Sequence, residues 1–298
     1  MAEFTGRDRA LLCSSGYMAN VGTLNALLDK QDAVFQDRLN HASLLDGGLI
    51  SGARFQRFLH NDLDNLTQRL KRTSARRKVI AVDSVFSMDG DCAPLPELAN
   101  LTAREDAWLM ADDAHGFGVL GKRGAGCAEH FDLSQKQLPI LMGTLGKAVG
   151  TYGAFVAGSE ALIETLIQFS RNYIYTTAIP PAVAAATRTS LVLIENETWR
   201  REKLQALIAR FRLGAKHLGL NLIDSITPIQ AVLVGGAADT LTISKMLEEK
   251  GFLVGAIRPP TVAEGSSRLR ITFNAEHSET QVDALLSALD ACMGASVS

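Results

Sequence analysis

The segment "KVIAVDSVFSMDGDCAPLPELANLTAREDAWLMAD" (78–112) decides the fold class of this chain. It begins with a mostly apolar run (78–86), continues through a helical pattern (94–105) and ends in a second apolar run (107–112). Strands that are apolar along nearly their whole length, alternating with helices, are typical of a parallel sheet covered on both faces. Functional side chains in such sheets lie beyond the carboxyl ends of the strands.

The same alternation extends outward from this segment over the first part of the chain. Other apolar runs with strand character cover residues 32–36, 53–59 and 138–143, and other helical patterns cover 15–29 and 62–72. We therefore expect a large α/β domain over residues 1–190. Its sheet should be mostly parallel, of the seven-stranded type, with helices on both faces.

The pattern changes after about residue 180, where a long helix-rich stretch begins at a Pro-Pro pair. The segments that follow alternate between strand-like and helical patterns: strands over 229–236, 252–257 and 267–274, and helices over 239–251 and from about residue 279. This order predicts a smaller α+β domain over residues 191–298.

Composition excludes several classes of protein. Of the 298 residues, 47% are hydrophobic and 21% charged, which is ordinary for a globular chain, and the net charge of −2 gives no case for nucleic-acid or anionic-membrane binding. There is no secretory signal and no apolar run of membrane-spanning length. The cysteines lie far apart, which argues against a zinc site or disulfide framework: Cys13, Cys92, Cys127 and Cys292. We expect a cytoplasmic protein without a metal.

The segment "LMGTLGKAVGTYGAF" (141–155) contains a single lysine, Lys147, among glycine, threonine and apolar residues. A lysine held in a dry, polar site can attack a carbonyl group as a free amine and form a Schiff base. Thr144 could hold a phosphate, and Gly146 allows close backbone approach. A solvent-facing loop is the ordinary setting of an isolated lysine. A nucleotide P-loop fails on spacing, because Leu141 and Ala148 replace the required glycine and Ser/Thr.

In "WLMADDAHGFGVLG" (108–121) a strand runs into Asp112 and, three residues later, His115. A carboxylate at a strand end can hold the protonated ring nitrogen of pyridoxal phosphate. An Asp-Asp pair that only opens a turn is the alternative interpretation. The G-x-G-x-x-G pattern over 116–121 does not open a helix, so we reject dinucleotide binding.

Three further segments carry side chains or backbone groups suited to one cofactor. Ser-Ser-Gly before a helix in "CSSGYMAN" (13–20) can bind a phosphate, His41 before another helix can stack on a ring, and Ser87 can donate to a ring oxygen. Arg258, before Pro-Pro, can clamp a substrate carboxylate. Taken alone, these residues are more typical of a helix cap, a turn or a surface position. Together they predict that Lys147 holds an aldehyde cofactor.

At this point the chain resembles a known family. The segments "SSGYMANVG", "DRLNHASLLDG", "VFSMDGDCAPL", "MADDAHGFGVLG", "GTLGKAVG" and "AIRPPTV…SRLRITFNAEH" are similar to those of the α-oxoamine synthases, which are fold-type I pyridoxal phosphate enzymes. The resemblance covers nearly the whole chain in order. The runs "FSMDGD", "DDAHG" and "RPPTV" are its most specific parts.

The resemblance implies a role for each residue at the cofactor ring. Lys147 would form the covalent link to pyridoxal phosphate, and Asp112 would pair with the pyridine nitrogen. His115 would bond near the ring hydroxyl, His41 would stack on the ring, and Ser87 would contact the cofactor.

The resemblance also implies phosphate and substrate contacts. Gly16 and Tyr17 would offer backbone amides to the phosphate, and Thr144 its hydroxyl. Thr261 would reach the phosphate from the partner subunit of a homodimer. Arg258 would clamp the carboxylate of the amino acid substrate.

The implied reaction is a decarboxylating condensation of L-alanine with a pimeloyl thioester, carried on coenzyme A or acyl carrier protein. It yields 8-amino-7-oxononanoate in biotin biosynthesis, with Lys147 moving the α-proton. Glycine-using members, such as 2-amino-3-ketobutyrate ligase and 5-aminolevulinate synthase, and an inactive scaffold remain alternatives. Family members carry roughly a quarter more chain before "SGYMAN", including a glycine-rich segment and an arginine for the acyl substrate. We therefore expect an N-terminally shortened member.

Overall fold

The computed structural model describes residues 1–295, which form two compact units. The first comprises Met1–Phe86 and Cys92–Thr198, and the second comprises Ser87–Asp91 and the chain from Trp199 onward. The boundary that we placed at residue 190 lies within helix α9 (Pro181–Asn196). The sequence did not predict that residues 87–91 belong to the second unit.

The first unit is built on a sheet of seven strands in the order β1-β7-β6-β5-β4-β2-β3. All strands run parallel except β7, which is antiparallel to both neighbours. The strands are β1 (Arg9–Cys13), β2 (Ala33–Asp37), β3 (Arg54–Phe58), β4 (Lys78–Asp83), β5 (Trp108–Asp112), β6 (Ile140–Thr144) and β7 (Ala154–Gly158). The expected mostly parallel sheet is confirmed. The strands β1 and β7, of five residues each, were not predicted from the sequence.

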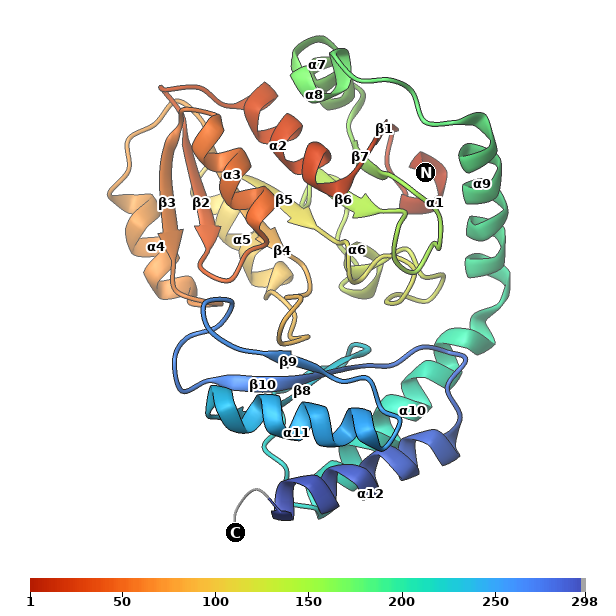
Figure 1. Cartoon of the computed structure of the whole chain (residues 1–298). Coiled ribbons are helices and arrows are strands. Elements are labelled where there is room, and N and C mark those ends of the chain that lie inside the picture. The colour runs from red at the N-terminus through yellow and green to blue at the C-terminus, as the bar shows by residue number, and fades with distance from the viewer. Residues whose placement is uncertain (296–298) are drawn as a thin grey trace. The chain divides into compact units, whose positions relative to one another are not determined.

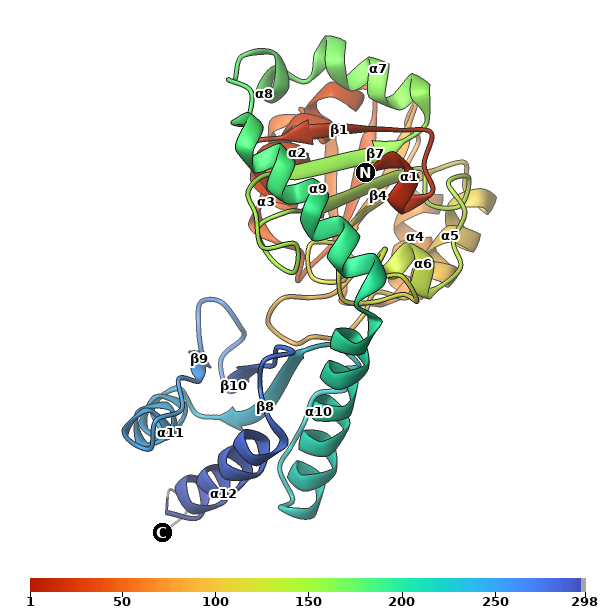
Figure 2. The same cartoon turned by 90° about the vertical axis from the view of Figure 1, so that its right-hand side faces the viewer.

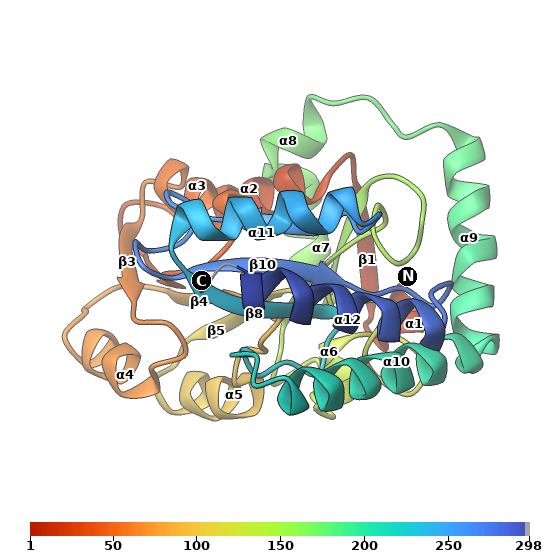
Figure 3. The same cartoon turned by 60° about the horizontal axis from the view of Figure 1, so that its bottom comes forward.

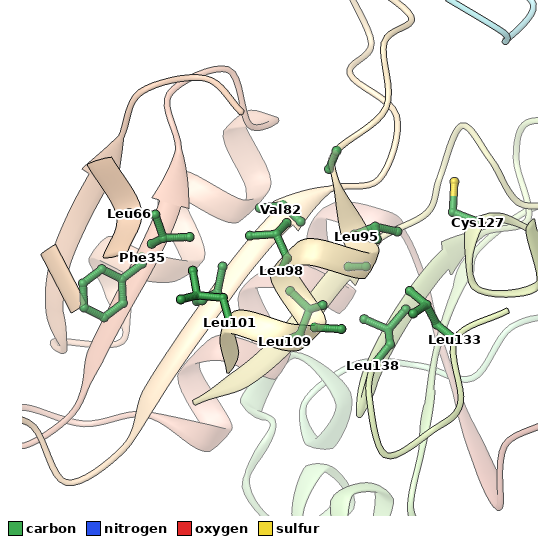
Figure 4. Close-up of a cluster of buried hydrophobic side chains, with 14 of the residues drawn as sticks. Phe35, Leu66, Val82, Leu95, Leu98, Leu101, Leu109, Cys127, Leu133 and Leu138 are labelled. Carbon is green, nitrogen blue, oxygen red and sulfur yellow. The ribbon is translucent and has the colours of Figure 1, made fainter. Parts of the chain in front are cut away.

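Helices cover both faces of this sheet (Figure 1). One apolar cluster packs helices α2 (Gly16–Leu27), α3 (Ala42–Ile50) and α7 (Glu160–Phe169) against one face. A second cluster packs α4 (Leu63–Lys71), α5 (Leu95–Arg104) and α6 (Cys127–His130) against the other. Figure 4 shows the second cluster, in which α5 contributes Leu95, Leu98 and Leu101. Their spacing of three places them on one side of the helix.

Three other helices complete the first unit. They are α1 (Ala2–Thr5), α8 (Arg171–Ile174) and α9, and Figure 2 looks onto the β1 edge, which α9 crosses. The helix-rich stretch expected after residue 180 forms two helices, because Glu197 has non-helical dihedral angles (φ −96°, ψ 60°) between α9 and α10 (Thr198–His217). Among residues 1–295, no helix is both long and apolar enough to cross a membrane.

The second unit is a three-stranded antiparallel sheet with helices on one face. The order is β8-β10-β9, with β8 (Ile229–Gly235), β9 (Gly255–Ile257) and β10 (Ser267–Thr272). Figure 3 looks onto α10, α11 (Ala237–Glu249) and α12 (Glu279–Ala295), which lie on one face of this sheet. The expected α+β order after residue 229 is confirmed.

Side chains of the second unit hold residues 87–91 in place. Arg268 forms a buried ion pair with Asp89, and Nε of Arg270 donates to the carbonyl of Ser87 at 2.6 Å. The hydroxyl of Ser225 donates to the carbonyl of Gly90 at 2.8 Å. These bonds explain why the loop after β4 belongs to the second unit.

Candidate active site

The site lies within the first unit, at the edge where its parallel strands end. Asp83, Asp112 and Thr144 are the last residues of β4, β5 and β6. Asp83 pairs with Asp112 in register, and Asp112 pairs with Met142, two residues before Thr144. The expectation that functional groups follow the carboxyl ends of the strands is therefore met by these side chains.

Asp112 is buried and held by two donors. Its Oδ2 accepts from Nδ2 of Asn20 at 2.7 Å, and its Oδ1 accepts from the backbone N–H of Ala114 at 3.0 Å. Burial raises the pKa of Asp112, and these hydrogen bonds oppose the rise because they stabilise the charged carboxylate. Each carboxylate oxygen retains a lone pair, so Asp112 can accept a further N–H donor.

His41 is the N-cap of α3 and lies at the same edge of the sheet. Its Nδ1 is 2.7 Å from Oγ of Ser43, and the backbone N–H of Ser43 also donates to Nδ1 at 3.3 Å. Nδ2 of Asn20 donates to the same Ser43 hydroxyl at 2.9 Å. His41 and Asp112 are thus connected through two intervening side chains.

Lys147 lies in the loop beyond β6. The strand is buried from Ile140 to Gly143, but the chain then turns outward and Lys147 is exposed. Lys147 is therefore exposed, although the strand that precedes it in the sequence is buried. Its Nζ lies 2.8 Å from Nε2 of His115, which comes from the loop after β5. The structure brings these two predicted residues together although 32 positions separate them in the sequence.

The residues predicted to bind the cofactor phosphate lie at the same edge of the sheet. Gly16 and Tyr17 form the first turn of α2, where backbone N–H groups have no acceptor within the helix. Ser15 caps this turn by accepting from the backbone N–H of Met18 at 3.2 Å. Thr144 pairs with the first residue of β7, which on its other side pairs with the last residue of β1, just before α2.

Three predicted site residues belong to the second unit: Ser87, Arg258 and Thr261. Ser87 is half-buried, whereas Arg258 and Thr261 are exposed in the loop after β9. The backbone N–H of Thr261 donates to the carbonyl of Arg258 at 3.1 Å. Their participation in the site stays a prediction.

Comparison with known proteins identifies the family. The aminotransferase class I and II family matches residues 1–289. The 8-amino-7-oxononanoate synthase of Cellvibrio japonicus is 64% identical over 293 residues, covering 98% of this chain and 74% of the relative. The chain belongs to the 8-amino-7-oxononanoate synthases of the class I and II family. Its relatives are longer, as we expected.

Solved structures agree with this assignment. The 8-amino-7-oxononanoate synthase of Francisella tularensis superposes with a TM-score of 0.89 at 33% identity, covering all of this chain and 86% of the other. A serine palmitoyltransferase from S. paucimobilis, solved with bound PLP-myriocin, gives 0.94 at 31% identity, over 99% of this chain and 75% of the other. The chain is thus a fold-type I, pyridoxal phosphate-dependent acyltransferase.

The residues of the first unit fit this cofactor. Asp112 keeps an acceptor site for a protonated ring nitrogen, and the first turn of α2 presents unpaired N–H groups of the kind that bind phosphate. Lys147 is exposed beside His115, where its amine can reach a bound aldehyde. Pyridoxal phosphate is therefore the cofactor of this family member.

A second buried carboxylate, Asp83, was not predicted from the sequence. It lies beside Asp112 across β4 and β5, and its Oδ2 accepts from the backbone N–H of His41 at 2.9 Å. Burial, and next the charge of Asp112, raise the pKa of Asp83 well above its usual range. Burial and the nearby charge of Asp112 therefore favour the protonated form of Asp83. The sequence did contain a signal for Asp83, because the apolar runs "KVIAVD" and "WLMAD" both end in an aspartate.

Asp113 was also missed, as were Asn20 and Ser43. Asp113 is fully buried, its Oδ2 accepts from the backbone N–H of Cys127 at 2.8 Å, and burial raises its pKa to about 7. Its carboxylate occupies the space that a Cβ atom would need at Gly116 and Gly126. Asp113 thereby fixes the loop 114–126, which carries His115.

Proposed function

We propose that this chain catalyses the decarboxylating condensation of L-alanine with a pimeloyl thioester. The products are 8-amino-7-oxononanoate, carbon dioxide and the free carrier, in a step of biotin biosynthesis. The observation that carries the proposal is the Lys147–His115 pair, 2.8 Å apart, at the strand edge where Asp112 is buried. The 64% identity to a relative of this name supports the choice among acyltransferases.

Bound pyridoxal phosphate supplies an aldehyde that captures amino groups and a protonated ring that withdraws electrons from the substrate α-carbon. Asp112 keeps the ring nitrogen protonated, because a buried negative charge favours the bound proton. Nζ of Lys147 removes the α-proton of alanine and returns a proton after carbon dioxide leaves. Nε2 of His115 fixes the position of Nζ through the 2.8 Å contact.

The remaining predicted residues complete the proposed site. His41 covers one side of the cofactor ring and excludes water from it. Gly16, Tyr17 and Thr144 hold the phosphate. We assign the alanine carboxylate to Arg258, which the family resemblance supports.

We also propose a homodimer in the cytoplasm, in which the partner's copy of Thr261 contacts the phosphate. Large apolar side chains of the first unit are exposed, including Phe169 at 64%, Tyr175 at 73% and Leu193 at 46%. Exposed large apolar side chains are available for a protein interface. Either coenzyme A or acyl carrier protein delivers the pimeloyl group.

The test is turnover with defined substrates. Purified protein loaded with pyridoxal phosphate is incubated with L-alanine and either pimeloyl-coenzyme A or pimeloyl-acyl carrier protein, and the product is identified by mass. We expect 8-amino-7-oxononanoate with alanine and much slower reaction with glycine. A protein that prefers glycine, or one that binds the cofactor but forms no product with either amino acid, would contradict the proposal.

A further inference from the structure

Asn20 has an unusual position between the carboxylate and the histidine of the site. It lies on α2 and is fully buried. Its Nδ2 is 2.7 Å from Oδ2 of Asp112 and 2.9 Å from Oγ of Ser43, whereas its Oδ1 has no hydrogen-bond partner. Both amide hydrogens are therefore used, and the reversed amide would place oxygen against the carboxylate. The orientation of Asn20 follows from its neighbours.

The hydrogen-bond donors near Nδ1 of His41 determine which of its two ring nitrogens carries the proton. The Ser43 hydroxyl accepts from Asn20 at 2.9 Å and lies 2.7 Å from Nδ1 of His41, to which it donates when Nδ1 carries no proton. The backbone N–H of Ser43 also points at Nδ1, at 3.3 Å. Because a backbone N–H can only donate, Nδ1 must accept, and the ring proton resides on Nε2.

Close approach of the two helices makes this arrangement possible. A Cβ atom on Gly47 of α3 would lie 3.1 Å from Cα of Val21 and 3.2 Å from the carbonyl oxygen of Asn20. Gly47 is one turn after Ser43 on the same face of α3. Glycine at this position lets α3 come near enough for Ser43 to reach Asn20.

We propose that Asn20 and Ser43 are positioning residues that join Asp112 to His41 in one directed hydrogen-bond relay. The relay stabilises the negative charge of Asp112 and holds His41 as the Nε2–H tautomer. This inference rests on the proposed function, in which Asp112 and His41 face the cofactor ring. A side chain that only filled the space between α2 and α3 would affect neither property.

The first experiment reads the tautomer directly in the unaltered protein. Long-range ¹H–¹⁵N correlation spectra of histidine-labelled protein, without and with pyridoxal phosphate, distinguish the two ring nitrogens, and loss of the signal in His41→Gln assigns it. We expect neutral His41 to carry its proton on Nε2 in both samples. A proton on Nδ1 would overturn the relay, whether or not the cofactor binds.

The second experiment removes each member of the relay and compares it with a matched control. Asn20→Leu is paired with Asn25→Leu on the same helix, where the amide donates only to the carbonyl of Ile50 at 3.3 Å. Ser43→Ala is paired with Ser51→Ala, where the hydroxyl donates to the carbonyl of Gly48 at 2.8 Å. Both controls remove a side-chain hydrogen bond from a position away from Asp112 and His41; the bond of Asn25 is exposed, whereas the bonds of Asn20 are buried.

Loss of a hydrogen bond to a charged group predicts that Asn20→Leu weakens pyridoxal phosphate binding by about 10-fold or more, measured by quenching of intrinsic fluorescence. Ser43→Ala should shift His41 toward a mixture of tautomers, and neither control should do either. Relay variants that match their controls in both readouts would refute the inference. Failure of the unaltered protein to bind the cofactor would instead refute the proposed function, while the tautomer still decides the inference.

Discussion

Asp112 and Asp113 are adjacent in the chain but have different environments. Asp112 faces Asn20 and the backbone of Ala114, where donors stabilise its charge. Asp113 faces the backbone of Cys127 and is fully buried, and one of its oxygens lacks a partner. Their roles differ because charge stabilisation depends on the donors that each carboxylate meets and not on residue type.

Asp113 should make the folded protein less stable as pH rises, which is the opposite of the usual effect of a carboxyl group. Its folded-state pKa of about 7 lies above the ordinary value of 3.8, so the folded protein binds the proton more tightly than the unfolded chain. The contribution of Asp113 to the free energy of unfolding is therefore greatest below its ordinary pKa and is lost as pH rises to 7, by about 4 kcal/mol in total.

Asp113→Asn should remove this loss, because the amide stays neutral and its oxygen can still accept from Cys127. We would measure urea unfolding of both proteins between pH 5 and pH 8. The difference between the two unfolding free energies should shift in favour of the variant as pH rises. Parallel curves over this interval would show that Asp113 does not titrate as described.

We propose that covalent attachment of the cofactor depends on Lys147. Borohydride reduction of the loaded protein should leave a stable label on the peptide that contains Lys147. Lys147→Ala should lose the label and about 10³-fold or more in kcat, because both covalent attachment and proton transfer are removed. Lys122→Ala, in the loop after β5, serves as the control and should keep the label. Labelling of any other lysine in the unaltered protein would refute the assignment.

At the scale of the elements, the start of α2 combines a structural cap with the proposed phosphate site. Ser15 caps α2 by accepting from Met18 at 3.2 Å, and Ser159 caps α7 in the same way by accepting from Leu162 at 3.2 Å. The two caps are therefore chemically equivalent. Only the first lies at the strand edge with Asp112 and Thr144.

This equivalence allows a matched comparison. Ser15→Ala and Ser159→Ala should each lower the free energy of unfolding by about 1 kcal/mol, because each leaves one helix N–H without its acceptor. Only Ser15→Ala should also weaken pyridoxal phosphate binding, since only its helix starts at the phosphate. Chemical denaturation and cofactor titration measure the two effects. Equal cofactor affinities would place the phosphate elsewhere.

At the scale of the whole molecule, the chain does not divide at a single point. Residues 87–91 interrupt the first unit and join the second, where Asp89 pairs with Arg268 in a buried ion pair. The segment "FSMDGD" therefore has a structural function in addition to any contact that Ser87 makes. The two units are connected by the chain both at this loop and between α9 and α10.

Removing Asp89 should destabilise the second unit. Asp89→Ala leaves the guanidinium of Arg268 buried without its partner, which typically costs about 3 kcal/mol or more. The exposed pair between Arg210 and Asp283 belongs to the same unit, and Asp283→Ala should change stability little. Hydrogen exchange, read separately in each unit, measures both. Equal protection in the two variants would mean that the buried pair contributes no more than the exposed one.

The sequence by itself determined the α/β class, most of the strands and the residue types of the site. These follow from local signals, because apolar runs predict buried strands and polar groups after them predict the functional edge. Lys147, Asp112, His115 and His41 were identified as candidates by this logic together with the family resemblance, and their roles stay predictions. The strands β1 and β7 were not predicted: β1 lies at the sheet edge and is only partly buried, and β7, although apolar, directly follows the glycine-rich loop that contains Lys147.

Tertiary structure alone decided which groups meet. Asn20 reaches Ser43 and Asp112 across 23 and 92 positions of sequence, through the packing of α2 on α3 and on the sheet. The exposure of Lys147, the coupling of Asp83 to Asp112 and the transfer of residues 87–91 to the second unit also depend on contacts between distant segments. A linear pattern identifies the groups, but burial and hydrogen-bond partners set their charge, and these arise only when the chain folds.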